Sequence, residues 1–242
     1  MSTNSSKKSP SKKAAKHAAP AKAKKPKGPF VERDLLTLRN LTPDDLTQLF
    51  KLTDAMKKTP DRFISALRGK TIGLLFQKPS SRTRVSFEVG MAQLGGQAIY
   101  LSDHEIQMGV REPIRDVART LSGYFNGVVL RTHAQATVEE FAKFASVPVL
   151  NGLSDLEHPC QILSDLYTIY AKYGKLKGIN ITYIGDSNNV LISMLYGAAI
   201  CGANLSIVTP RGYEPTEEMM KDIKVLSKDS GAKFAMSNSL FV

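Results

Sequence analysis

Residues 71–101 read TIGLLFQKPSSRTRVSFEVGMAQLGGQAIYL, and this stretch decides the fold. The apolar run Thr71–Phe76 leads through a polar loop into a helical pattern over Thr83–Leu94, which two glycines close. A second apolar run, Ala98–Leu101, follows directly. A strand, a helix and a strand joined by short loops are typical of a unit with two parallel strands. The sequence therefore predicts an α/β fold.

The same alternation continues in both directions along the chain. Upstream, Thr42 and Pro43 are typical of a helix start, and the helix should run to about Lys58. A second short helix should end near Gly69. The elements expected downstream are a helix from Pro113 to about Tyr124, a strand at Val128–Arg131, a helix at Val138–Phe144, a strand at Val147–Leu150 and a helix from Pro159 to about Tyr173.

After Gly174 the alternation begins again. The expected elements are strands at Ile179–Ile184, Leu205–Val208 and Lys233–Met236, with helices at Val190–Ile200 and Thr216–Ser227 between them. Three parallel strands with two helices leave one sheet edge and much apolar surface bare. We therefore expect two doubly wound parallel-sheet domains, residues 31–173 and 174–242, of which the second is incomplete.

Composition excludes several classes of protein. With 242 residues, 42% of them hydrophobic, the chain can bury a sizeable core. Two cysteines cannot build a disulfide framework, which favours a reducing compartment and a cytoplasmic location. The longest nearly apolar run, Val190–Cys201, is too short for a membrane helix of about 20 residues. We expect no contact with a membrane.

The positive charge is concentrated at the N-terminus. Residues 1–30 hold nine lysines and no acid, so they carry +9 of the net +11 and leave the body nearly neutral. This stretch is expected to be a disordered basic arm, because it has too little apolar surface to order. It lacks the apolar segment of a secretory signal and the arginines of a transit peptide, which makes the mitochondrial matrix less favoured. The arm either contacts polyanions or is a solvated tail.

The loop after the first strand has the layout of an anion site. Ser80, Ser81 and Thr83 supply three hydroxyls beside the Arg82 guanidinium, at a helix start whose N–H groups attract negative charge. One capping hydroxyl would suffice for the helix alone, so we interpret the group as a phosphate cradle. No nucleotide-loop pattern of glycines is present, which favours a small phosphorylated metabolite. Arg84, by contrast, is expected to pair with Glu88 four residues on.

A second candidate site follows the strand at 147–150. Pro159 at the first helical position makes His158 the cap residue and Gln161 the third helical residue, so both should face the strand ends. A histidine can donate to a carbonyl oxygen, and a glutamine amide oxygen can accept from an NH2 group. The pair could therefore hold a carbamoyl group. A capping glutamine and a structural histidine explain the residues equally well.

Together, these motifs resemble a known family. Ser-Ser-Arg-Thr-Arg at 80–84, Asp-Val-Ala-Arg at 116–119, Val-Leu-Arg at 129–131, Asn-Gly-Leu-Ser-Asp at 151–155 and His-Pro-Cys-Gln at 158–161 occur in the order of the aspartate/ornithine carbamoyltransferases. The likeness runs from about residue 34 to the end and is to the ornithine branch. It implies two α/β domains with the active site between them, and assembly as a homotrimer.

The resemblance also implies roles for individual residues. Carbamoyl phosphate would be held by Ser80, Ser81, Arg82, Thr83, Gln107, Arg131, His158 and Gln161, with Gln107 reaching into a neighbouring subunit's site. Asn189 would bind ornithine. Without the family, Arg131 would be interpreted as part of a strand-end salt bridge and Gln107 as a solvated loop residue. The turn before Asn189 would be an Asx cap provided by Asn188 or Ser187.

The implied reaction is transfer of the carbamoyl group to the δ-amine of ornithine, which gives citrulline and phosphate in arginine metabolism. Arg82, Arg131 and His158 would be the catalytic residues, and no metal or other cofactor is expected. Cys160 and Cys201 are assigned to packing.

The family continues beyond this length, to an Asp-x-x-x-Ser-Met loop and a His-Cys-Leu-Pro segment that contact the acceptor. Neither occurs in the 242 residues. We therefore expect a fragment or a truncated relative, whose own activity is open. The alternatives are a sister carbamoyltransferase that uses another amine, such as putrescine, and a truncated, non-catalytic binding or assembly partner.

Overall fold

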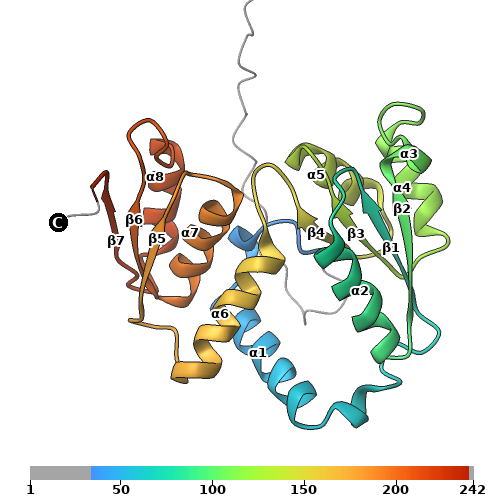
Figure 1. Cartoon of the computed structure of the whole chain (residues 1–242), viewed down its shortest axis with the longest axis horizontal. Coiled ribbons are helices and arrows are strands. Elements are labelled where there is room, and N and C mark those ends of the chain that lie inside the picture. Colours follow the sequence, from blue (N-terminus) through green and yellow to red (C-terminus); the bar gives the residue numbers. More distant parts are fainter. Residues whose placement is uncertain (1–33, 240–242) are drawn as a thin grey trace, which may run out of the picture.

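The computed structural model describes residues 34–239; residues 1–33 and 240–242 lie outside this range, and with them the predicted basic arm of residues 1–30. Two parallel sheets stand side by side, with helices α1 (Pro43–Lys58) and α6 (Pro159–Tyr173) between them (Figure 1). None of the helices within residues 34–239 is long and apolar enough to cross a membrane.

The first sheet has four parallel strands in the order β2-β1-β3-β4. They are β1 (Thr71–Phe76), β2 (Gln97–Ser102), β3 (Gly127–Arg131) and β4 (Val149–Leu153). Side chains alternate between its faces, so Leu75 and Leu130 pack with α4 (Ile114–Ser122) and α5 (Gln135–Phe144), whereas Leu74 and Val129 pack on the side of α2 (Ser81–Gln93). Helices therefore cover both faces, which is the doubly wound arrangement that the sequence predicts.

The second sheet contains β5 (Asn180–Ile184), β6 (Asn204–Val208) and β7 (Phe234–Ser237), parallel and in that order. One face packs through Leu205 and Ile207 against a cluster that includes residues of α7 (Asn189–Cys201) and α8 (Glu217–Leu226). On the other face Thr182, Ser206 and Ala235 lie in register and are exposed. Within residues 34–239 this sheet is covered on one side only, so the second domain is partial, as expected.

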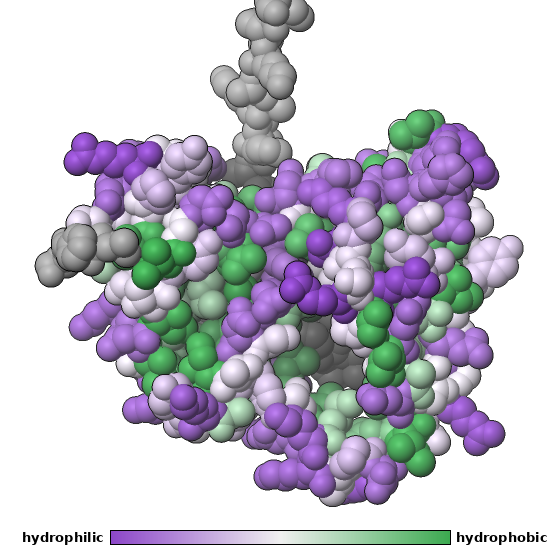
Figure 2. Space-filling model, viewed as in Figure 1, coloured by the Kyte–Doolittle hydropathy of each residue, from purple (hydrophilic) through white to green (hydrophobic). Residues whose placement is uncertain are grey.

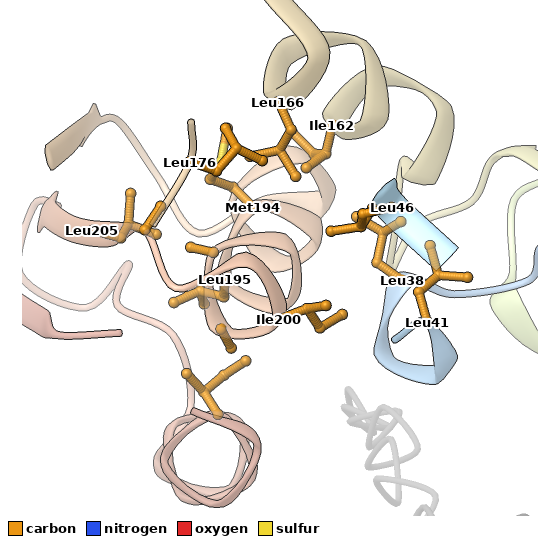
Figure 3. Close-up of a cluster of buried hydrophobic side chains, with 14 of the residues drawn as sticks. Leu38, Leu41, Leu46, Ile162, Leu166, Leu176, Met194, Leu195, Ile200 and Leu205 are labelled. Atoms are coloured by element: carbon orange, nitrogen blue, oxygen red, sulfur yellow. The ribbon is translucent and has the colours of Figure 1, made fainter. Parts of the chain in front are cut away.

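The main core joins the two ends of the described chain. Leu38 of the 3-10 helix η1 (Leu38–Asn40) and Leu46 of α1 pack with α6, α7 and β6 in one buried cluster (Figure 3). Gly197 lies where α7 crosses α6, and a side chain there would bring its Cβ to 2.9 Å from a Leu166 methyl group. The glycine therefore sets how closely the two helices approach.

Several elements begin and end where the sequence predicts. The Thr42 hydroxyl accepts a hydrogen bond from Asp45 N, and the Asp45 carboxylate accepts one from Thr42 N, which fixes the start of α1. α6 begins at Pro159 and ends at Tyr173, where the left-handed φ of 70° at the following Gly174 closes the helix. β1 likewise keeps its predicted bounds.

Most other predicted bounds shift by one to three residues; α5, for example, begins at Gln135 rather than Val138. β4 begins at Val149 rather than Val147, because Pro148 has no N–H for the ladder, and it continues through polar Asn151 to Leu153. The predicted helix before Gly69 is a 3-10 turn, η2 (Pro60–Phe63), followed by further turns. The short helix α3 (Asp103–Ile106) was not predicted, because four residues show no periodicity.

Candidate active site

Apart from Asn189, which follows β5 of the second sheet, the predicted site residues follow strands of the first sheet, whose carboxyl ends lie along one side of that sheet. β1 and β3 are neighbours, yet the chain goes from β1 to the strand on one side and from β3 to the strand on the other. Such a switch point is the usual ligand position in open α/β sheets. In Figure 2 hydrophilic side chains gather along the upper edge of the molecule, where the loops after these strands lie in Figure 1.

The loop after β1 leads directly into α2. Ser80 is its cap residue, because its hydroxyl accepts from Thr83 N at 3.3 Å and donates to Thr83 Oγ1 at 3.0 Å. Arg82 is exposed and makes no ion pair with another described residue. A side chain at Gly152 in β4 would come within 3.8 Å of Thr83 Cγ2, so the start of α2 lies over the ends of the neighbouring strands. One hydroxyl caps the helix, which leaves Ser81 and Arg82 available to a ligand.

Arg131 is the last residue of β3. Its carbonyl accepts a hydrogen bond from Gln77 N at 2.7 Å, which ties the loops after β1 and β3 together. Its Nε atom is buried without a hydrogen-bond partner, and burial lowers the pKa of the guanidinium. In residues 34–239 it forms no salt bridge, so the alternative interpretation of Arg131 is wrong. A buried N–H without an acceptor lowers the stability of the fold, and a ligand that accepts its hydrogen bond would remove this cost.

His158 is the cap residue of α6, as predicted, and its Nδ1 atom is buried without a partner. Burial, and then the charge of Arg131, lower the pKa of the imidazole to about 4. The ring is therefore neutral at physiological pH, with one N–H donor and one acceptor nitrogen. A purely structural histidine would satisfy its buried nitrogen, and this one does not.

Gln161 lies in the first turn of α6 and is exposed. Its amide nitrogen donates to Asp165 at 2.9 Å. This contact orients the side chain and leaves the amide oxygen as an acceptor, the group that a carbamoyl NH2 would require.

Gln135, which was not among the predicted site residues, holds the segment between β4 and α6 through hydrogen bonds. The Gln135 side-chain oxygen accepts from Asn151 at 3.0 Å and from the Ser154 hydroxyl at 2.6 Å. Its backbone N–H donates to Asp155 at 2.8 Å. Asn151 and Ser154 are fully buried, so this network fixes the loop that carries His158.

Glu157 was also missed, although it directly precedes His158. The side chain is 2% exposed, and burial raises the pKa of its carboxyl group. It accepts hydrogen bonds from the Thr37 hydroxyl, from Leu38 N at 3.1 Å and from the Ser193 hydroxyl at 3.1 Å. No sequence signal marks this carboxylate, because its partners lie more than a hundred residues before it or on α7.

In the turn after β5, one asparagine caps α7 and the next contacts the loop after β4. The Asn188 side chain accepts from Val190 N at 2.9 Å and Leu191 N at 3.3 Å, so Asn188 caps α7. Asn189 donates instead to the carbonyl of Ser154 at 2.7 Å. The predicted acceptor-binding residue thus lies against the loop after β4, where the second sheet meets the first.

Gln107 lies in the segment that follows β2. It ends α3 with a φ of 47°, the single positive φ among the non-glycine residues that the structure describes. Its side chain is exposed, and its N–H donates to Asp103 O at 2.7 Å. The loop after β2 therefore presents Gln107 outward, in a conformation that costs a non-glycine residue energy.

The remaining expectations concern Arg84 and the cysteines. Arg84 pairs with Glu88 at 2.9 Å and stacks 4.0 Å from the Tyr100 ring centroid, so its structural interpretation is confirmed. Burial raises the pKa of both Cys160 and Cys201 to about 11, which keeps the thiols protonated and unreactive at neutral pH.

Chemically, one edge of the sheet combines an anion-attracting helix start with a guanidinium whose Nε atom is buried, a neutral imidazole and an amide. The helix start and the cations suit a phosphate group. The imidazole and the glutamine oxygen suit the two ends of an amide.

Comparisons with known proteins point to the same chemistry. Residues 33–171 match the model of the carbamoyl-P binding domain of aspartate/ornithine carbamoyltransferases, and residues 177–241 match that of the Asp/Orn binding domain.

Individual relatives agree. The chain is 45% identical over 210 residues to an ornithine carbamoyltransferase of Aquifex aeolicus, a match that covers 86% of this chain and 69% of the relative. It is 50% identical over 202 residues to one of Oceanobacillus iheyensis, which covers 83% and 63%. The structure of ornithine carbamoyltransferase from Pyrococcus furiosus superimposes with a TM-score of 0.82 at 42% identity, over 85% of this chain and 66% of that one. The chain spans about two thirds of the length of these relatives.

Proposed function

The chain belongs to the aspartate/ornithine carbamoyltransferase family, and from that premise we propose that it transfers the carbamoyl group of carbamoyl phosphate to the δ-amine of ornithine. The products would be citrulline and phosphate. Two parallel α/β sheets support this assignment, as does the contact of Asn189 with the loop after β4.

One observation carries the proposal. Arg131 Nε and His158 Nδ1 are both buried without hydrogen-bond partners, and the charge of Arg131 acts on the His158 ring. Two unsatisfied polar atoms, in side chains near enough for the charge of one to act on the other, are best explained by a ligand that both groups contact. A carbamoyl phosphate carbonyl, beside its phosphate, is such a ligand.

In the bound state, Ser80, Ser81, Arg82 and Thr83 hold the phosphate at the start of α2. Arg131 spans the phosphate and the carbonyl oxygen. The neutral His158 ring donates to that oxygen, and the Gln161 amide oxygen accepts from the carbamoyl NH2. The exposed Arg82 and the orphaned Arg131 nitrogen support these roles, since neither is used within the described part of the chain.

The reaction needs no nucleophilic side chain. The neutral δ-amine attacks the carbamoyl carbon, the carbon–oxygen bond to phosphate breaks, and the new C–N linkage loses the amine proton. Charge builds on the carbonyl oxygen and then on the phosphate, where His158, Thr83, Arg131 and Arg82 stabilise it. The protonated thiols of Cys160 and Cys201 are consistent with a scheme of this kind.

Asn189 binds the ornithine acceptor, from the turn after β5. Its contact with the Ser154 carbonyl supports this role, because it brings the turn to the carbamoyl side of the site. Ornithine, rather than aspartate or putrescine, is favoured by relatives that are named ornithine carbamoyltransferase.

The proposed working form is a cytoplasmic homotrimer that acts in arginine metabolism. Gln107 would then complete a neighbouring subunit's site. Its outward, left-handed position in the loop after β2 supports this, because no described residue of its own site contacts it through a hydrogen bond.

The test is citrulline formation by the purified 242-residue chain given carbamoyl phosphate and ornithine, with putrescine and aspartate as parallel acceptors. Citrulline formation that His158→Gln abolishes would support the proposal. Turnover with putrescine alone would assign the sister reaction. No turnover with any acceptor, in a chain that also fails to bind carbamoyl phosphate, would refute the function.

A further inference from the structure

Glu157 is a buried carboxylate that the proposed mechanism does not use. It lies at the meeting point of three segments: η1 supplies Thr37 and Leu38, α7 supplies Ser193, and Glu157 itself precedes His158. Burying an ionised group is costly unless its oxygens are fully hydrogen-bonded. Three donors, one of them a backbone N–H, meet that requirement here.

The hydrogen bonds form a chain with a fixed direction. The His158 backbone N–H donates to Ser193 Oγ at 2.9 Å, and the Ser193 hydroxyl donates to Glu157 at 3.1 Å. A backbone N–H can only donate, so the serine oxygen accepts from His158 and the serine hydroxyl proton is directed toward Glu157. Ser193 is fully buried, and a low local dielectric strengthens its hydrogen bonds.

We propose that Glu157 is a positioning residue for His158, which acts through Ser193 to hold the main chain from which the imidazole projects beside Arg131. The role deepens the function proposed above, because it affects catalysis only if His158 contacts the carbamoyl carbonyl. A misplaced ring would leave the carbonyl without its neutral donor.

The surroundings of the carboxylate supply a matched control. Arg39 and Tyr196 are the other ionisable groups whose charges act on Glu157 or feel its charge. Arg39 makes two bonds to Asp222 of α8, at 2.6 and 2.7 Å, so this ion pair also joins η1 to the second sheet's helices. Asp222→Asn therefore weakens the same junction without touching the His158 segment.

The readout is the protonation of the His158 ring in the full chain without substrate. Nitrogen NMR at about pH 5.5 distinguishes neutral imidazole from imidazolium, and the His158→Gln spectrum identifies the signal among four histidines. Wild type should show a neutral ring, since its pKa is about 4. Glu157→Gln and Ser193→Ala should raise the titration midpoint by about one unit or more toward 6.5, because the released ring reaches water.

Carbamoyl transfer gives a second readout. Glu157→Gln should lower kcat by about tenfold or more with little change in the KM for ornithine, as expected for a misaligned group near the reacting atoms. Should wild type make no citrulline, carbamoyl phosphate binding decides the proposed function, and the NMR measurement still decides the role of Glu157.

The proposal is supported if the titration midpoint of His158 rises in both Glu157→Gln and Ser193→Ala and stays at its wild-type value in Asp222→Asn. An unchanged midpoint in both variants would overturn the proposal. An equal rise in Asp222→Asn would also overturn it, because any weakening of the junction would then raise the midpoint. If Glu157→Gln does not fold, Ser193→Ala decides alone, since it removes a single oxygen.

Discussion

His158 should make the folded protein sensitive to mild acid. Its pKa is about 4 in the folded chain against 6.5 for an ordinary histidine, so between these values the unfolded chain binds the extra proton. The stability is therefore complete above pH 6.5 and is lost progressively as the pH falls toward about 4. Replacing His158 with glutamine removes the titrating group and should remove this loss.

The size of the effect follows from the same two values. A fall from 6.5 to about 4 corresponds to about 3.4 kcal/mol at 1.36 kcal/mol per pH unit. The ring is only half-buried, and water screens it, so we expect half of that, about 1.7 kcal/mol. Glu157 and Asp34, whose pKa values burial raises, change stability in the opposite direction over this range, but they are common to both chains.

The assay is urea unfolding of wild type and His158→Gln at several pH values between about 4.5 and 7.5. The difference between the two free energies of unfolding should grow in favour of the variant as the pH falls. Parallel pH profiles would refute the reasoning, because they would mean that the folded chain accepts the proton on His158 as readily as the unfolded one.

Three further predictions concern binding and packing. Arg82→Ala should weaken carbamoyl phosphate binding in calorimetry by about 1.5–3 kcal/mol, the cost of a lost charged hydrogen bond, whereas Arg84→Ala should not, because Arg84 pairs with Glu88. Equal losses in the two variants would contradict the phosphate assignment. Leu166→Ala, at a fully buried position between α6 and α7, should lower the free energy of unfolding by about 3–5 kcal/mol, and a loss under about 1 kcal/mol would mean that the site collapses freely. Gly73→Ala should destabilise by about 1–3 kcal/mol in the same measurement, because the added carbon would lie 2.5 Å from the Phe125 ring; an unchanged midpoint would show that the ring can move aside.

Local signals were enough to locate most of the fold. The bounds of α6 could be read from Pro159 and Gly174, because each residue has a backbone preference that ends or starts a helix. The end of β4 could not, because Asn151 and Gly152 look like loop residues. Asn151 pairs with Leu130 of β3 as a strand residue, and its side chain bonds to Leu36 and Gln135, partners that only folding brings near.

The candidate site shows the same division. Ser80–Thr83 and the turn from His158 to Gln161 are linear motifs, so their chemistry is legible in the sequence. Gln135, Glu157 and Ser193 carry no such signal, since each acts through partners that only folding brings near. The domain boundary at residue 173, the roles of the individual site residues and the basic arm stay predictions.

The cluster around Leu38 has a consequence for how the chain is made. Leu38 and Leu46 are among the first described residues to leave the ribosome, yet their packing partners on α7 follow about 150 residues later. The four strands of the first sheet are synthesised before α7, so this sheet can form while Leu38 and Leu46 are still exposed to water. Closing so long a loop is slow, and during synthesis those leucines are exposed to chaperones and to other nascent chains.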